Sequence, residues 1–104
     1  MEQINPKHKQ YIIHVIKKHC PGAKIIAFGS RVRGDAQRYS DLDIALKQDL
    51  TLSALNLELI AEEFSNSDLA FKIDLVDYHR VSEEFQAIID REGVLWDSQL
   101  HIAN

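Results

Sequence analysis

The spacing of apolar residues along the chain predicts helices that alternate with short strands. After Asn5, which can cap a helix, and Pro6, which suits a first turn, apolar side chains recur every three or four positions until a Pro-Gly pair at 21–22. Ser82 can cap a later helix, and Gly93 stands where its C-terminal cap belongs. The predicted helices span residues 6–20, 51–64 and about 83–91.

Runs of β-branched residues and regular alternation predict strands between these helices. The clearest alternation places Leu42, Ile44 and Leu46 on one face of a strand and the intervening residues on the other. The polar, basic stretch 30–40 is predicted to be a loop or a short helix. The predicted strands span residues 24–28, 42–47 and 70–78, with 94–96 forming a last strand or a packed turn. This order predicts an α/β (α+β) fold in which helices lie over one small sheet.

Composition narrows the class of protein. The chain has 104 residues, of which 45% are hydrophobic, and this suffices for one domain with a modest core. We expect that domain to span residues 1–96, with 97–104 as a frayed tail. Such a domain leaves little chain for a separate substrate-recognition domain.

The sequence also indicates where the protein is located and which partners its charge disfavours. No apolar run approaches the ~20 residues that cross a bilayer, and the N-terminal sequence lacks the layout of a signal peptide. A single cysteine, Cys20, excludes an internal disulfide and fits a reducing compartment, so we expect a soluble cytoplasmic protein. The net charge of −4 gives no overall attraction for nucleic acid and argues against a polymerase.

Three aspartates are placed where they could meet. Asp41 and Asp43 stand two positions apart at the start of a strand, so both point to the same face. Asp74 lies inside another strand and faces away from the apolar side of that strand. We expect it to be a buried aspartate, which would be hard to explain without a cation. If the two strands are neighbours, the three carboxylates converge, and Mg²⁺ ions are their natural partners. Asp77 is a rival for the third place, but alternation puts it on the opposite face from Asp74.

A Gly-Ser pair upstream of these aspartates has the features of a phosphate-binding turn. Gly29 and Ser30 directly follow a strand, where glycine lets the backbone approach a ligand and the serine hydroxyl can bond phosphate oxygens. Arg31, Arg33 and Arg38 add positive charge beside it. Each feature alone has a structural explanation as a turn, a solvated strand face or a basic loop, whereas their combination favours chemistry on a polyphosphate.

The combined motif resembles that of a known family. Gly29-Ser30, ten intervening residues and Asp41-Leu42-Asp43, with Arg33-Gly34-Asp35 inside and Ser40 before the pair, resemble the minimal nucleotidyltransferase family of the polymerase-β superfamily. The resemblance covers nearly the whole chain, and we see no departure from the motif that would indicate a dead enzyme. It implies a small mixed sheet flanked by helices. It also implies transfer of a nucleoside monophosphate from an NTP, here ATP, to an acceptor hydroxyl.

The resemblance also assigns roles to individual residues. Asp41, Asp43 and Asp74 would be the catalytic carboxylates and would hold two magnesium ions. Asp74 would also assist the acceptor hydroxyl. The remaining motif residues would hold the nucleotide; they are Gly29, Ser30, Arg33 and Ser40.

A protein partner follows from the same resemblance. Relatives of this kind are paired with HEPN-domain toxins, which they neutralise as antitoxins by adding AMP to a tyrosine. The apolar stripe of the predicted 51–64 helix could be the docking face, although burial in the core is the more common explanation for such a stripe. Two alternatives stay open. One is a transferase that acts on a small, antibiotic-type molecule, for which a homodimer could supply the pocket. The other is a stoichiometric binder that performs no chemistry.

Overall fold

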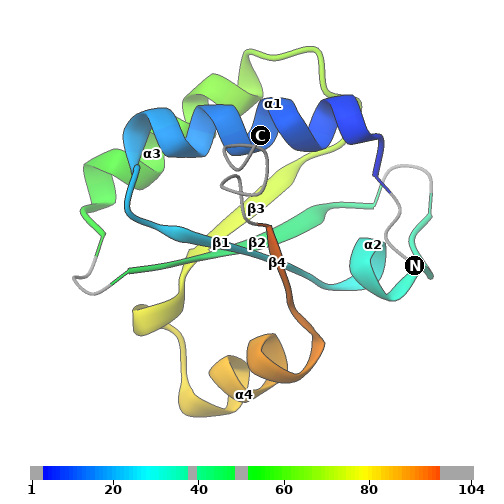
Figure 1. Ribbon diagram of the computed structural model, residues 1–104, viewed down its shortest axis with the longest axis vertical. Coiled ribbons are helices and arrows are strands. Elements are labelled where there is room, and N and C mark those ends of the chain that lie inside the picture. Colours follow the sequence, from blue (N-terminus) through cyan, green and yellow to red (C-terminus); the bar gives the residue numbers. More distant parts are fainter. Residues whose placement is uncertain (1–3, 38–39, 49–51, 97–104) are drawn as a thin grey trace, which may run out of the picture.

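A four-stranded mixed sheet of order β3-β2-β1-β4 lies at the centre of the molecule (Figure 1). The computed structural model describes residues 4–37, 40–48 and 52–96. In chain order the elements are α1 (Pro6–His19), β1 (Lys24–Phe28), α2 (Ser30–Arg33), β2 (Leu42–Lys47), α3 (Ala54–Ser65), β3 (Ile73–Asp77), the 3-10 turn η1 (Tyr78–Arg80), α4 (Glu83–Glu92) and β4 (Val94–Trp96). The predicted α/β class is therefore confirmed, and 94–96 is a strand.

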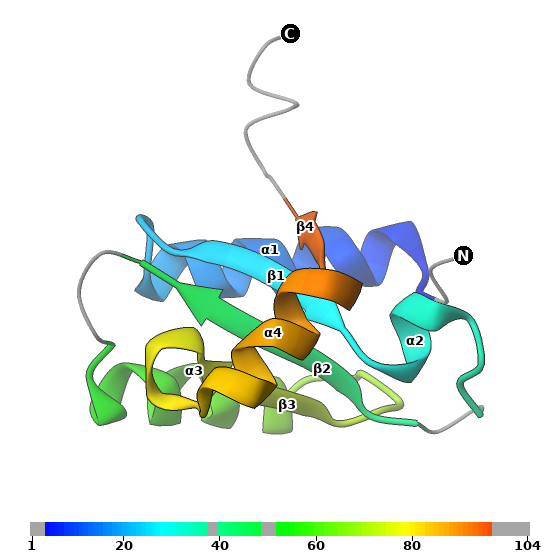
Figure 2. The same ribbon diagram turned by 90° about the horizontal axis from the view of Figure 1, so that it is seen from below.

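The sheet combines antiparallel and parallel pairs. β1 pairs antiparallel with both β2 and β4, whereas β2 pairs parallel with β3. A parallel pair needs a long crossover, and α3 lies within the crossover between β2 and β3. Helices α1 and α3 cover one face of the sheet, and α4 crosses the other (Figure 2).

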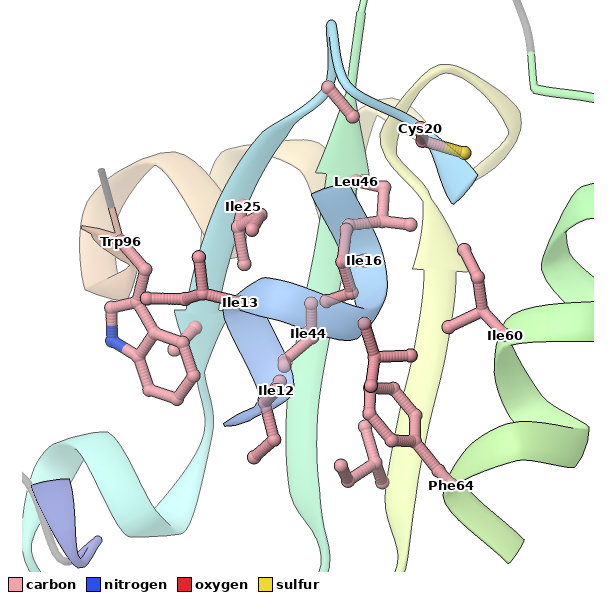
Figure 3. Packing of buried hydrophobic residues seen from close by; sticks show 14 of the residues in the cluster. Ile12, Ile13, Ile16, Cys20, Ile25, Ile44, Leu46, Ile60, Phe64 and Trp96 are labelled. Carbon is pink, nitrogen blue, oxygen red and sulfur yellow. The ribbon is translucent and has the colours of Figure 1, made fainter. Parts of the chain in front are cut away.

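The larger hydrophobic core lies between the sheet and the α1–α3 layer (Figure 3). Alternate residues of β2 point into it, as the sequence predicted, and Trp96 closes one side from the end of β4. Each large apolar side chain buried there contributes roughly 1.5–3 kcal/mol to folding. Its fully buried members include Ile12, Ile16, Ile25, Ile44, Leu46, Ile60 and Trp96.

A smaller core joins α4 to the opposite face of the sheet. Ala45, which alternates with the larger core residues of β2, is fully buried there together with Ile89 of α4. The rings of Phe28 and Phe85 meet edge to face with their centroids 5.6 Å apart. This packing fixes α4 against the last residue of β1, which directly precedes Gly29.

The largest differences from the predicted element boundaries are in α3 and β3. The helix predicted from residue 51 begins at Ala54, because the Ser53 hydroxyl accepts a hydrogen bond from the Asn56 N–H at 3.0 Å and caps it. The strand predicted over 70–78 spans only Ile73–Asp77, and it ends there because Asp77 caps the 3-10 turn that starts at Tyr78. The frayed tail predicted for 97–104 lies outside the described residues.

The apolar stripe of α3 is only partly used by the core. Ile60 and Phe64 are buried, whereas Leu55 is 62% exposed and Leu59 is 40% exposed. Burial in the core therefore explains Ile60 and Phe64, whereas Leu55 and Leu59 face outward. No helix in the described parts of the chain is long and apolar enough to cross a membrane. The expected cytoplasmic location stays a prediction.

Gly93 is required for space, and this gives a testable prediction. Its φ of −72° is open to any residue, but a Cβ there would lie 2.5 Å from both Cγ2 of Ile26 and the carbonyl oxygen of Ile89. We expect Gly93→Ala to lower the free energy of unfolding by about 1–3 kcal/mol, and thermal melting should show it. Gly22→Ala is the matched control, since a Cβ at Gly22 meets nothing within 4 Å. Equal melting temperatures for the two variants would contradict this explanation.

Candidate active site

The register of β2 and β3 brings the predicted carboxylates together. Asp43 and Asp74 are register partners in the parallel pair, and Asp41 stands immediately before β2. Neighbouring strands lie about 4.8 Å apart, and register partners point to the same face of a sheet. The condition that the two strands are neighbours is therefore confirmed, while the catalytic roles of the three aspartates stay predictions.

The burial of these aspartates differs from the prediction. Asp74 is exposed because β3 is an edge strand, so the inference that it is a buried aspartate in need of a cation is wrong. That inference fits Asp43, which is half-buried. Burial raises the pKa of the Asp43 carboxyl, the negative charges of Asp74 and Asp41 raise this pKa further, and the positive charge of Arg33 opposes the shift. Asp41, Asp43 and Asp74 together form the carboxylate cluster, and Asp43 is the member whose pKa is raised by burial and by the other two.

Gly29 leaves the space that the Asp43 carboxylate occupies. Phe28, the last residue of β1, is the register partner of Asp43, so Gly29 follows directly beside it. A Cβ built on Gly29 would collide with Oδ2 of Asp43. The backbone there has φ 88° and ψ −163°, a region that essentially only glycine adopts. Gly29 is therefore required for the close approach of the turn to Asp43, while its predicted contact with a phosphate stays a prediction.

Ser30 and Arg33 stand at the two ends of α2 on one face. They are three positions apart in this short helix, and residues at that spacing are neighbours on a helix surface. The Arg33 guanidinium lies 3.2 Å from Oε1 of Glu92 and 3.4 Å from Oδ2 of Asp35. Hydrogen bonds to Glu92 and then Asp35 raise the pKa of Arg33. A phosphate bound by Arg33 would therefore share it with these carboxylates.

Arg31 and Ser40 shape the loop that leads to Asp41. Arg31 is buried, donates from Nε to the Ser40 carbonyl at 2.8 Å and stacks over the Phe71 ring at 4.2 Å. The Ser40 hydroxyl accepts from the Gln37 N–H at 2.8 Å. Arg31 is thus a structural residue, contrary to its predicted share in the phosphate-binding charge. The nucleotide contact predicted for Ser40 stays a prediction, and Arg38 lies outside the described residues.

Asp77, the rival third carboxylate, has a structural role. It is buried, and its two oxygens accept hydrogen bonds from the Leu52 N–H at 3.1 Å and the His79 N–H at 3.0 Å. Arg80 adds an ion pair at 3.6 Å. As alternation predicted, Asp77 does not belong to the carboxylate cluster.

The chemistry of the carboxylate cluster fits a hard divalent cation. Within residues 4–37, 40–48 and 52–96, no three His, Cys, Asp or Glu side chains are arranged to enclose a metal ion by themselves. Mg²⁺ does not require such an enclosure, because it usually binds through one or two carboxylates together with substrate phosphates. The mutual repulsion of Asp41, Asp43 and Asp74 is the cost that a cation would relieve.

The raised pKa of Asp43 predicts a pH-dependent cost to stability. The folded protein keeps a proton that the unfolded chain releases, so this residue's contribution to stability falls as pH rises from the ordinary aspartate range through the raised pKa. Without divalent cations, we therefore expect Asp43→Asn to melt at a higher temperature than the unmodified protein at neutral pH. The difference should shrink towards acidic pH. Melting curves recorded in EDTA across this range test it, and a difference that does not depend on pH would contradict it.

Comparisons with known proteins agree with this geometry. The family described as "Polymerase beta, Nucleotidyltransferase" matches residues 10–99. A probable protein adenylyltransferase, MntA of Haemophilus influenzae, is 41% identical over 81 residues, which are 78% of this chain and 71% of that protein. A crystal structure of a toxin–antitoxin complex with AMP-PNP matches with a TM-score of 0.74 and 28% identity, over 89% of this chain and 76% of that chain.

A second solved complex shares the fold. It is a tri-AMPylated HEPN toxin of Shewanella oneidensis bound to an MNT antitoxin, and it matches with a TM-score of 0.69 and 24% identity, over 93% of this chain and 76% of that chain. On the family match and the relative that is 41% identical, this chain belongs to the polymerase beta nucleotidyltransferase family.

Proposed function

We propose that this protein transfers AMP from ATP to a tyrosine hydroxyl of a HEPN-domain toxin and thereby acts as its antitoxin. The observation that carries the proposal is the convergence of Asp43 and Asp74 on neighbouring strands, directly beside the Gly29 turn. The related protein adenylyltransferase supports protein as the acceptor. The matching toxin–antitoxin complex with AMP-PNP supports both an ATP-like substrate and a toxin as partner.

The nucleotide would lie along α2 and the start of β2. Ser30 and Arg33 would donate hydrogen bonds to the triphosphate, Gly29 would let it approach the backbone, and Ser40 would contact it from the loop. Asp41 and Asp43, with Asp74 opposite, would hold magnesium, and the bound metal would neutralise charge on the phosphates.

The acceptor would approach from the β3 edge of the sheet. Its hydroxyl oxygen would form a bond to the α-phosphorus, the bond from that phosphorus to pyrophosphate would break, and Asp74 would take the hydroxyl proton. Asp74 is exposed and lies on an edge strand, so a hydroxyl carried by another chain can reach it.

Transfer can be tested with the purified protein, Mg²⁺ and a co-purified HEPN-domain toxin. ATP would carry the label on the α-phosphate in one reaction and on the γ-phosphate in another. We expect a labelled toxin band with the α-label only, abolished by EDTA, and located on a tyrosine by mass spectrometry. An unlabelled toxin that is nevertheless neutralised would overturn the proposal in favour of stoichiometric binding. Pyrophosphate release without labelled protein would indicate a small-molecule acceptor instead.

A further inference from the structure

Arg33 is held from two sides by carboxylates of different elements. Its Nε lies 3.4 Å from Oδ2 of Asp35, and its Nη1 lies 3.2 Å from Oε1 of Glu92. Asp35 follows α2 closely in the chain, whereas Glu92 is the last residue of α4 and stands 59 positions beyond Arg33. Within the part of the chain that the structure describes, neither contact uses the remaining terminal nitrogen, Nη2.

Contacts at two different nitrogens fix the plane of the guanidinium group. Its N–H donors lie in one rigid plane, so holding Nε and Nη1 also sets the directions of the N–H bonds on Nη2. Arg33 lies one helical turn after Ser30 on the same face of α2. Burial and the neighbouring aspartates raise the pKa of Asp43, and the charge of Arg33 opposes this rise, so the guanidinium lies within electrostatic reach of the carboxylate cluster. The Arg33 guanidinium is thus oriented beside Ser30 and beside the carboxylate cluster.

Glu92 is itself rigidly placed. Its side chain is only 27% exposed, and the next residue, Gly93, packs tightly against Ile26 of β1 and donates its N–H to the Ile89 carbonyl at 2.7 Å. A carboxylate at the C-terminal end of a helix is disfavoured by the helix dipole. Glu92 pairs at 3.8 Å with Arg91 of the same helix and more closely, at 3.2 Å, with Arg33. The closer of its two ion pairs thus links α4 to α2 beside the candidate site.

We propose that Glu92 is a positioning residue for nucleotide binding: it holds Arg33 so that Nη2 meets the triphosphate beside Ser30. The inference rests on the proposed function, in which Arg33 contacts the triphosphate. Glu92 makes no contact with the substrate in this arrangement and acts through Arg33 only. The opposite role, in which Glu92 competes with phosphate for Arg33, predicts an effect of opposite sign.

The test is the affinity for AMP-PNP with Mg²⁺, measured by calorimetry on the Glu92→Gln variant. We expect its Kd to rise about 2- to 5-fold, the range expected for loss of one partly exposed ion pair. In transfer assays the KM for ATP should rise by the same factor while kcat changes by less than about twofold, because the reacting groups are untouched. Glu84→Gln is the matched control: it makes the same charge change on an exposed residue of α4 and should leave Kd unchanged.

A double-mutant cycle separates positioning from a general effect on α4. In an Arg33→Ala background, Glu92→Gln should change Kd no further. The inference is overturned if Glu92→Gln leaves Kd unchanged, if it tightens binding, or if its effect is the same with and without Arg33. Absence of transfer in the unmodified protein would count against the proposed function, whereas the Kd values test Glu92 whether or not transfer occurs.

Discussion

The Asp43→Asn variant is expected to lose AMP transfer by about 10²–10³-fold or more, because each ~1.4 kcal/mol of lost transition-state stabilisation costs a factor of ten and metal-linked charge stabilisation amounts to several kcal/mol. Asp43 is the member of the carboxylate cluster that both burial and its neighbours affect most strongly. Asparagine keeps its shape and removes its charge. The loss should therefore concern the reaction and leave the fold intact.

Stability and activity should change in opposite directions in this variant. The repulsion among Asp41, Asp43 and Asp74 destabilises the metal-free protein, so its removal should raise the melting temperature in EDTA while transfer is lost. A damaged fold would lower both. Asp68→Asn is the control, since Asp68 is an exposed carboxylate that lines a cavity beside Tyr11 of α1 and is not among the causes of the Asp43 pKa shift. Transfer by Asp43→Asn within about tenfold of the unmodified protein would remove Asp43 from the catalytic group.

Local sequence patterns predicted the elements that the backbone itself determines. Asn5 accepts the Lys7 N–H at 2.8 Å and caps α1 as its side chain suggested. The alternation in β2 sends its aliphatic residues into the larger core and Asp43 to the opposite face. These features depend on neighbours within a few positions, so one sequence contains the information for them.

The order of the strands in the sheet decides two features that the sequence does not show, which are the exposure of Asp74 and the adjacency of β2 and β3. Nothing in the residues around Asp74 indicates that β3 is an edge strand, and its edge position is why Asp74 is exposed. The convergence itself depended on β2 and β3 being neighbours, which the sequence offered only as a condition. Exposure and adjacency are both properties of the assembled sheet.

Long-range contacts divided the arginines, which the sequence presented as one basic group. Arg31 is buried against the Phe71 ring and donates a hydrogen bond to the Ser40 carbonyl. Arg33 instead forms an ion pair with Glu92 of α4. Both lie on the same short helix, and no local signal distinguishes them. Glu92 was missed for the same reason, because its link to Arg33 spans 59 positions.

Gly29→Ala is expected to damage both stability and activity. The φ of 88° and ψ of −163° at Gly29 are open to little besides glycine, so alanine there should cost about 1–3 kcal/mol of folding free energy. The added methyl group would also collide with Oδ2 of Asp43 and displace the carboxylate. Displacements of about 1 Å in reacting groups can cost roughly 10²-fold in rate, and we expect a loss of that order in transfer by the folded fraction.

Gly34→Ala distinguishes backbone strain from the collision with Asp43. Gly34 has a similar φ of 89° but a left-handed ψ of 13°, in which alanine is disfavoured by only about 1–2 kcal/mol. It should lose stability with little loss of transfer, whereas Gly29→Ala should lose both. Combining Gly29→Ala with Asp43→Ala should recover part of the stability, because the carboxylate that the methyl group meets is gone, while transfer stays absent. If Gly29→Ala transfers AMP as well as Gly34→Ala does, the close approach of the turn to Asp43 is a packing detail and contributes nothing to the reaction.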